Sequence, residues 1–427
     1  MAKGKRCASR RKRRSPVLPI LLTLALVVGA AALVLPRVLT GDEEIPPAVD
    51  GETEGTAQGG GQQGADEGAE TDPEPAPPPE PEPTLAETTL EGMTLYEKVC
   101  QLFIVFPRDI TGVSQVVAAG ETTRKALEEY PVGGFIYDKS SMQSIEQVTT
   151  MLETTQTFVK IPMIFTCDEE GGRVNRLMST VGTTWVGPML DYKEEGTDKA
   201  AENALTIAKD LVACGFNTDL APVADVWSNP DNTVIGDRAY SDDYEEAAEL
   251  VAAAVAGFHE GGVACTLKHF PGHGDTSADS HYGSVYIYKS MDEIRAEELL
   301  PFKAGIEAGA DAVMMGHLIV TDVDEDLPAV FSYEMVTEIL RGELGFDGVV
   351  MTDALQMQAM TDHYSSGEIA VKAVKAGVDM LLCPLDLDAA VEALLAAVES
   401  GEITEERINE SVLRILTLKE NRGILTE

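Results

Sequence analysis

Basic residues are scarce in this sequence of 427 residues, which has 32 Lys and Arg against 72 Asp and Glu and a formal net charge of -40. Eight of the basic residues fall within the first fourteen positions, so the rest of the chain is more acidic still. A field of this sign repels nucleic acid phosphates, and no basic patch interleaved with aromatic residues opposes it. The composition therefore argues against a nucleic-acid partner.

Closely spaced cysteines are also missing. No C-x-x-C pair or other short spacing of the zinc type occurs, so the sequence predicts neither a zinc finger nor a disulfide framework. Several cysteines lie within apolar runs, as is typical of small buried side chains. The six are Cys7, Cys100, Cys167, Cys214, Cys265 and Cys383.

The N-terminal region has the pattern of a membrane segment. Residues 1–16 form a basic tail, which should stay in the cytoplasm, and residues 17–36 form an apolar run of about the ~20 residues that span a bilayer. A cleaved signal peptide is the alternative, since small residues occur at 29–32. We expect an uncleaved anchor, because the run exceeds the ~7 to 15 residues of a signal-peptide core and no clear cleavage site ends it.

Residues 41–88 contain no Lys or Arg and are rich in Glu, Pro and Gly, including the run DPEPAPPPEPEP. Proline favours extended backbone geometry, and the like charges repel one another. The segment has too few apolar residues to form a core. It is predicted to be a disordered acidic linker that holds the following domain away from the membrane.

Residues 90–425 alternate short apolar runs with longer amphipathic segments, which indicates an α/β fold. Helices are predicted at 144–159, 198–215, 245–262 and 290–309. The predicted strands are QLFIVF (101–106), GGFIYD (133–138), MIFTCD (163–168), FNTDLAPV (216–223), ACTLKHF (264–270), AVMMGHLIV (312–320), GVVMTDAL (348–355) and DMLLCPL (379–385). Eight such units predict a single (β/α)8 TIM-type barrel, with an open doubly wound sheet as the alternative.

In such a barrel the active site lies at the carboxyl ends of the strands, where this sequence has many polar residues. Asp353 follows the apolar run of GFDGVVMTDAL, so its carboxylate is placed to attack the anomeric carbon of a sugar. The other interpretation is that Asp353 caps the next helix. The residues around it leave both interpretations open.

The segment KHFPGHGDTSADSH, residues 268–281, holds three of the six histidines. Lys268 and His269 should lie rigidly at a strand end, where they can donate hydrogen bonds to substrate hydroxyls. Asp279 and His281 are spaced so that the carboxylate can orient the imidazole, and such a pair can shuttle a proton. Metal binding is the alternative, but the spacing of these histidines and His317 fits no standard zinc pattern, and we predict no metal site.

These motifs, together with DEEGGRVNR, resemble those of family 3 glycoside hydrolases, in particular the bacterial β-N-acetylglucosaminidases of cell-wall recycling. The resemblance spans about residues 90–425. It implies a β/α barrel and a retaining double displacement. We expect no cofactor. By matched position, Asp353 is the nucleophile, and His281 is the general acid and base with Asp279 as its partner.

The resemblance also implies a set of sugar-binding residues, each carried by one of the matched motifs. They are Asp168, Arg176, Arg238, Lys268 and His269. The chain departs from the family at Glu169, where Gln or His is common. We expect this additional acid, if it lies near the site, to disfavour anionic sugars.

The sequence thus predicts a monomeric exo-β-N-acetylglucosaminidase that releases terminal β-linked N-acetylglucosamine from muropeptides or other peptidoglycan fragments. Its domain should lie outside the cytoplasmic membrane, anchored by the N-terminal segment, or be secreted if that segment is cleaved. The alternatives are a β-N-acetylglucosaminide phosphorylase, a broader β-glucosidase and a non-catalytic wall-binding module.

Overall fold

The computed structural model describes residues 82–276 and 283–426. The expected membrane segment, most of the expected linker, and Asp279 and His281 lie outside the described residues. No helix in the described ranges has both the length and the apolar character needed to cross a membrane. Helix α1 (Leu85–Glu91) begins inside the segment assigned to the linker, because Thr84 caps it and Glu87 completes a capping box.

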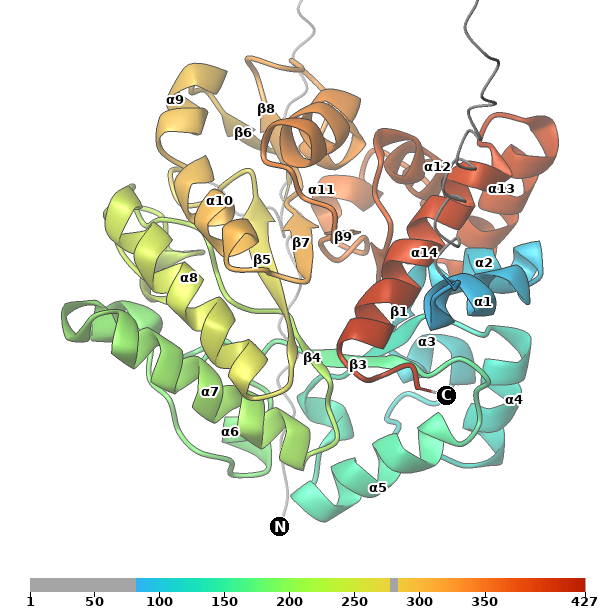
Figure 1. Ribbon diagram of the computed structural model, residues 1–427. Coiled ribbons are helices and arrows are strands. Elements are labelled where there is room, and N and C mark those ends of the chain that lie inside the picture. The colour runs from blue at the N-terminus through green and yellow to red at the C-terminus, as the bar shows by residue number, and fades with distance from the viewer. Residues whose placement is uncertain (1–81, 277–282, 427) are drawn as a thin grey trace, which may run out of the picture. The chain divides into compact units, whose positions relative to one another are not determined.

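Eight parallel strands form the centre of the domain (Figure 1). They are β1 (Phe103–Val105), β2 (Gly134–Ile136), β3 (Ile164–Cys167), β4 (Thr218–Asp219), β5 (Ala264–Phe270), β7 (Ala312–Met315), β9 (Val349–Thr352) and β10 (Leu381–Leu382). From β1 to β9 each of these strands pairs with the next one in chain order, and β10 pairs with β1. All eight lie within the runs that the sequence predicts as strands.

Between β9 and β10 the barrel is closed by an isolated bridge, whereas the other neighbouring strands pair over two or more residues. Met351 and Met380 form a single parallel bridge there, and the Thr352 amide donates to the Met380 carbonyl at 2.9 Å. Apolar side chains from alternate strand positions, such as Ile104, Ile164 and Met314, fill the interior. The centre of the barrel is therefore a packed core and not a pore.

Helices surround the strands (Figure 1). The longest are α5 (Ile145–Gln156), α7 (Thr197–Ala213), α8 (Tyr244–Glu260), α12 (Ser366–Ala376), α13 (Leu387–Ser400) and α14 (Glu405–Asn421). Shorter ones are α2 (Leu95–Gln101), α3 (Pro107–Thr111), α4 (Glu121–Glu129), α6 (Leu177–Thr180), α9 (Met291–Ala296), α10 (Leu299–Glu307), α11 (Gln358–Thr361) and a π-helix, η5 (Glu334–Glu343). Polar caps such as Ser144, Asp243 and Thr404 begin many of them. Helix α14 lies beside α1, where Glu420 accepts from the Ala86 amide at 2.9 Å.

Two predicted elements are each divided in the structure. The run AVMMGHLIV ends as a barrel strand at Met315. The Gly316 amide still donates to the Phe270 carbonyl of β5 at 2.9 Å, and the chain then bends at His317. Its remainder is β8 (Leu318–Val320), which pairs with β6 (Val285–Ile287) in a small parallel ribbon that the sequence did not predict. The helix expected at 290–309 is divided into α9 and α10.

Candidate active site

A pocket of about 300 Å³ lies among the carboxyl ends of the barrel strands. It contains all six of the predicted site residues that the structure describes: Asp168, Arg176, Arg238, Lys268, His269 and Asp353. Apolar side chains, among them Phe106, Leu220 and Met357, complete its wall. The volume is at the lower end of the range for small-molecule sites, roughly 300–1,000 Å³, which suits one sugar unit better than a chain.

Five charged side chains of alternating sign form a continuous chain along one wall of this pocket. Arg176 Nη2 lies 2.7 Å from Asp168 Oδ2, and Lys268 Nζ lies 3.0 Å from Asp168 Oδ1. Lys268 Nζ also lies 2.6 Å from Glu170 Oε1. Glu170 in turn accepts two hydrogen bonds of 2.8 Å from Arg238. Each charge is thus compensated by a neighbour, as buried charges require.

The pKa values in this chain follow from that arrangement. Burial alone would raise the pKa of the Glu170 carboxyl, but Arg238 and Lys268 outweigh burial and hold it well below its usual value. Burial would likewise raise the pKa of Asp168, but Lys268 and Arg176 hold it below its usual value. Burial would lower the pKa of Lys268, but Glu170 and Asp168 raise it. All these groups are ionised at neutral pH and present fixed donors and acceptors to a ligand.

Asp353 lies directly after β9, where the predicted nucleophile was expected. Its amide donates to the Met315 carbonyl at 3.0 Å, and its Oδ1 accepts from the Ala354 amide at 2.7 Å. Burial would raise the pKa of this carboxyl, but His269 and His317 hold it below its usual value. A carboxylate kept ionised in a pocket is available as a nucleophile.

His269 is fixed by an aspartate on the neighbouring strand end. Its Nδ1 lies 2.7 Å from Asp225 Oδ2, while Asp225 Oδ1 accepts from the amides of His269 and His273 at 3.1 and 2.6 Å. Burial would raise the pKa of Asp225, but His269 lowers it below its usual value. An ionised Asp225 therefore determines which way the imidazole of His269 faces.

Sequence reasoning missed two of these residues, Glu170 and Asp225. Glu170 stands two positions after Asp168, and side chains two apart on an extended chain lie on the same side, which is a usable signal. Asp225, in APVADV, also follows an apolar run. No pattern in the sequence, however, indicates that Asp225 orients His269.

Glu169 does not lie in the pocket, so the expectation that it adds an acid near bound sugar was wrong. It is buried, and its carboxylate accepts from the amides of Arg176, Leu177 and Met178 at 2.5, 2.8 and 3.0 Å. It therefore holds the start of helix α6. Burial raises its pKa against these hydrogen bonds.

At the rim, the Arg108 guanidinium lies 3.7 Å from the centre of the Phe106 ring, and it forms an ion pair with Asp138. These groups come from the segments that follow β1 and β2. Asp279 and His281, the predicted proton-transfer pair, belong to the connection after β5 and lie outside the described residues.

The chain is similar to known proteins over most of this domain. The model of the glycosyl hydrolase family 3 N-terminal domain matches residues 94–418. A β-hexosaminidase of Stenotrophomonas maltophilia is 37% identical over 279 residues, which are 62% of this chain and 81% of that protein. β-Hexosaminidase A of Pseudoalteromonas piscicida is 32% identical over 322 residues, or 69% of this chain, and the chain spans 54% of its length.

A solved structure gives the same result. It is a glycoside hydrolase family 3 β-N-acetylglucosaminidase from Paenibacillus sp. FPU-7, with a TM-score of 0.74 and 40% sequence identity, covering 78% of this chain and 64% of that one. The family match extends from helix α2 into α14 and so includes the barrel and the pocket. The chain therefore belongs to glycosyl hydrolase family 3.

Proposed function

We propose that residues 90–425 form a retaining exo-β-N-acetylglucosaminidase. The observation that carries the proposal is the position of Asp353, an ionised carboxylate in a pocket whose volume suits a single sugar. A pocket of this size favours cleavage at the end of a glycan. The similarity to proteins named β-hexosaminidase and β-N-acetylglucosaminidase supports the choice of sugar.

The proposed reaction has two displacements. In the first, an oxygen of Asp353 attacks the anomeric carbon, the glycosidic bond breaks, and His281 gives a proton to the departing oxygen. In the second, His281 takes a proton from water as that water attacks the anomeric carbon, and the bond to Asp353 breaks. Asp279 orients the imidazole in both steps. The sugar leaves with its anomeric configuration retained.

Binding of the sugar is assigned to the chain of alternating charges. Lys268, Arg176 and Arg238 offer N–H donors at fixed positions, and Asp168 offers acceptor oxygens. Hydroxyl and acetamido groups need both kinds of partner. Because these side chains already hold one another, little side-chain entropy is lost when the sugar binds.

A direct test is turnover of an aryl β-N-acetylglucosaminide by the full chain. Asp353→Asn should abolish it, whereas Asp347→Asn, an exposed aspartate before the same strand, should leave it unchanged. A fluorinated substrate should trap a glycosyl group on the peptide that contains Asp353. Unimpaired turnover by Asp353→Asn would refute the assignment.

The products separate this proposal from its rivals. N-acetylglucosamine formed equally with and without phosphate supports hydrolysis, whereas a sugar phosphate formed only with phosphate identifies a phosphorylase. Preference for an aryl glucoside would identify a β-glucosidase. Glycan binding without release of sugar would identify a wall-binding module.

We further propose that the substrate is peptidoglycan and that the domain lies outside the cytoplasmic membrane. The basic residues 1–16, the apolar run 17–36 and the acidic linker motivate this location. When cells are lysed and fractionated, the full chain should be found in the membrane fraction. While the cytoplasmic membrane is still intact, the C-terminal domain should be open to added protease. Recovery in the soluble cytoplasm would contradict the location but not the reaction.

A further inference from the structure

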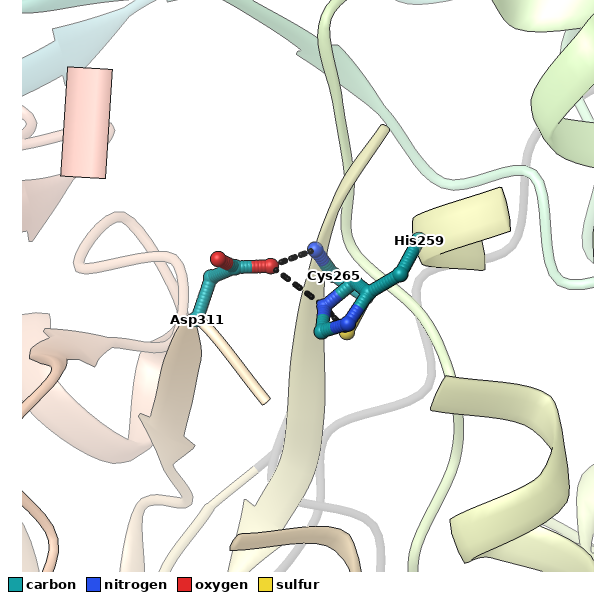
Figure 2. Close-up of side chains that lie close together, drawn as sticks. All are labelled: His259, Cys265 and Asp311. Carbon is teal, nitrogen blue, oxygen red and sulfur yellow. Dashed lines mark hydrogen bonds and ion pairs between the residues drawn. The ribbon is translucent and has the colours of Figure 1, made fainter. Parts of the chain in front are cut away.

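Three side chains that can bind metal meet at the end of the barrel opposite the pocket. His259 lies in the last turn of α8, Cys265 is the second residue of β5, and Asp311 precedes β7. Figure 2 shows the imidazole beside the thiol, with the carboxylate directed toward both residues. Lys268 and His269 lie toward the other end of β5, so this cluster is separate from the active site.

The potential ligand atoms are already close together. His259 Nε2 lies 3.0 Å from Asp311 Oδ2 and 3.7 Å from Cys265 Sγ, and all three atoms lie within 4.8 Å of one another. In a tetrahedral zinc site with bonds of about 2.0 Å to N and O and about 2.3 Å to S, such atoms are roughly 3.3–3.6 Å apart. Shifts of about an ångström or less would bring these three to that spacing.

The nitrogen at the centre of the cluster has too many neighbours. His259 Nε2 faces Asp311 Oδ2, Cys265 Sγ and also Arg422 Nη2, which lies 2.5 Å away. A ring nitrogen either donates one proton or offers one lone pair, so it cannot donate to the carboxylate and accept from the guanidinium at the same time. A cation bound to Nε2, Oδ2 and Sγ would satisfy all three ligand atoms at once.

We propose that His259, Cys265 and Asp311 form a zinc site, with Arg422 occupying part of it when the metal is absent. A thiolate, an imidazole and a carboxylate are a ligand set typical of zinc, and the soft sulfur disfavours calcium and magnesium. The fourth position is left for water. On binding, the Cys265 thiol loses its proton to solvent, and the zinc–sulfur bond forms.

Supporting contacts for this site are already present. Asp311 Oδ2 accepts from the Cys265 amide at 3.0 Å, and Asp311 Oδ1 accepts from Arg422 Nε at 2.6 Å. Arg422 Nε can therefore continue to donate to Asp311 Oδ1 while Arg422 Nη2 moves away from the His259 imidazole. The Cys265 side chain is buried, whereas those of His259 and Arg422 are 21% and 20% exposed, which leaves an approach for the ion.

Three elements would be joined by this ion: the end of α8 and the starts of β5 and β7. Since the cluster lies away from the pocket, the site should stabilise the fold and take no part in sugar chemistry. Zinc added to chelator-treated full chain should bind at one ion per chain and raise the unfolding temperature by at least ~2 °C.

The test compares ligand variants with a buried-cysteine control. Cys265→Ser and His259→Gln should each weaken zinc binding by more than about 100-fold in calorimetry, because second-shell changes alone cost 10–100-fold. Cys214→Ser, at another buried cysteine, should leave zinc affinity unchanged. Circular dichroism shows whether each variant is folded, and His259→Gln provides the test if Cys265→Ser is not.

Cobalt in place of zinc gives a readout that does not depend on affinity. The cobalt-loaded protein should show a thiolate-to-metal charge-transfer band, which Cys265→Ser removes. The proposal is overturned if the folded full chain binds no zinc, if binding is equal in the ligand variants and the wild type, or if the cobalt band is absent. None of these readouts involves turnover, so the proposed glycosidase activity stands or fails separately.

Discussion

Arg238 donates two hydrogen bonds of 2.8 Å to Glu170, and this ion pair is the last in the series of alternating charges along the pocket wall. The Glu170 side chain is 3% exposed and that of Arg238 12%, and Glu170 also lies 2.6 Å from the Lys268 ammonium. Glu170 therefore fixes at once the two cations that we propose bind the sugar. Substitution of Glu170 should therefore weaken substrate binding, although Glu170 is not proposed to take part in the chemical steps.

Glu170→Gln should lower kcat/KM by roughly 10- to 100-fold, since a hydrogen bond to a charged group is worth about 1.5–3 kcal/mol. The main effect should be a higher KM for the aryl N-acetylglucosaminide, because Lys268 and Arg238 lose their shared anion. Glu128→Gln, on an exposed ion pair with Arg124, is the matched control and should have no effect. An unchanged KM in Glu170→Gln would show that the Glu170 carboxylate is not needed to position Lys268 and Arg238 for substrate binding.

His281 and His269 should be distinguishable by the leaving group of the substrate. His281→Asn should slow a substrate with a poor leaving group by about 100-fold or more, and an activated aryl substrate far less, because only the former needs protonation. His269→Asn should slow both equally, since Asp225 holds that imidazole for binding. Equal losses in His281→Asn would remove it from the role of general acid.

Lys419→Met should stabilise the domain in a pH-dependent manner. Lys419 is fully buried beside Gln101, 2.8 Å away, and burial lowers its pKa to about 7. Between about pH 7 and its unfolded value near 10.5, the unfolded chain binds a proton that the folded chain does not, so wild-type stability rises with pH.

Below about pH 7 the buried lysine is charged in the folded state. The gain from Lys419→Met in the free energy of unfolding should therefore be larger at pH 6 than at pH 9, as measured by denaturant unfolding. Lys125→Met, on a side chain 69% exposed, should show no such difference. A gain that is independent of pH would contradict a lowered pKa.

Asp219→Asn should show the opposite trend. Asp219 is buried in β4, and burial raises its pKa well above the usual value. A carboxyl with a raised folded pKa loses stability as pH rises above the unfolded value, because the folded state retains a proton that the unfolded state releases.

The asparagine variant should therefore match the wild type only below the unfolded value of 3.8, near pH 3, and become relatively more stable from there toward pH 8. Asparagine can keep the hydrogen bond that Asp219 accepts from the Glu169 amide at 3.0 Å. The unfolding temperatures of the variant and the wild type, measured across this pH range, test the prediction. If the variant instead lost stability as pH rose, Asp219 would be ionised in the folded protein.

The sequence predicted the strands well because each barrel strand is a short apolar run that ends at polar residues. Lys268, His269 and Asp353 could be predicted from their place at a strand end, whereas Asp168, Arg176 and Arg238 were predicted only from the resemblance to a known family. Sequence reasoning misplaced Glu169 because three acids follow β3 in succession, and on an extended chain the middle one lies on the side opposite to Asp168 and Glu170. Lys419, Asp311 and Arg422 could not be assigned, because their environments depend on elements distant in the sequence.

The charges that line the pocket compensate one another, and this has a consequence for the solution in which the protein works. The neutral sugar of the proposed reaction would meet hydrogen-bond donors and acceptors at fixed positions there, and no uncompensated charge. Added salt screens exposed charges far more than buried pairs. Substrate affinity should therefore vary little with ionic strength, even though the chain as a whole is strongly acidic.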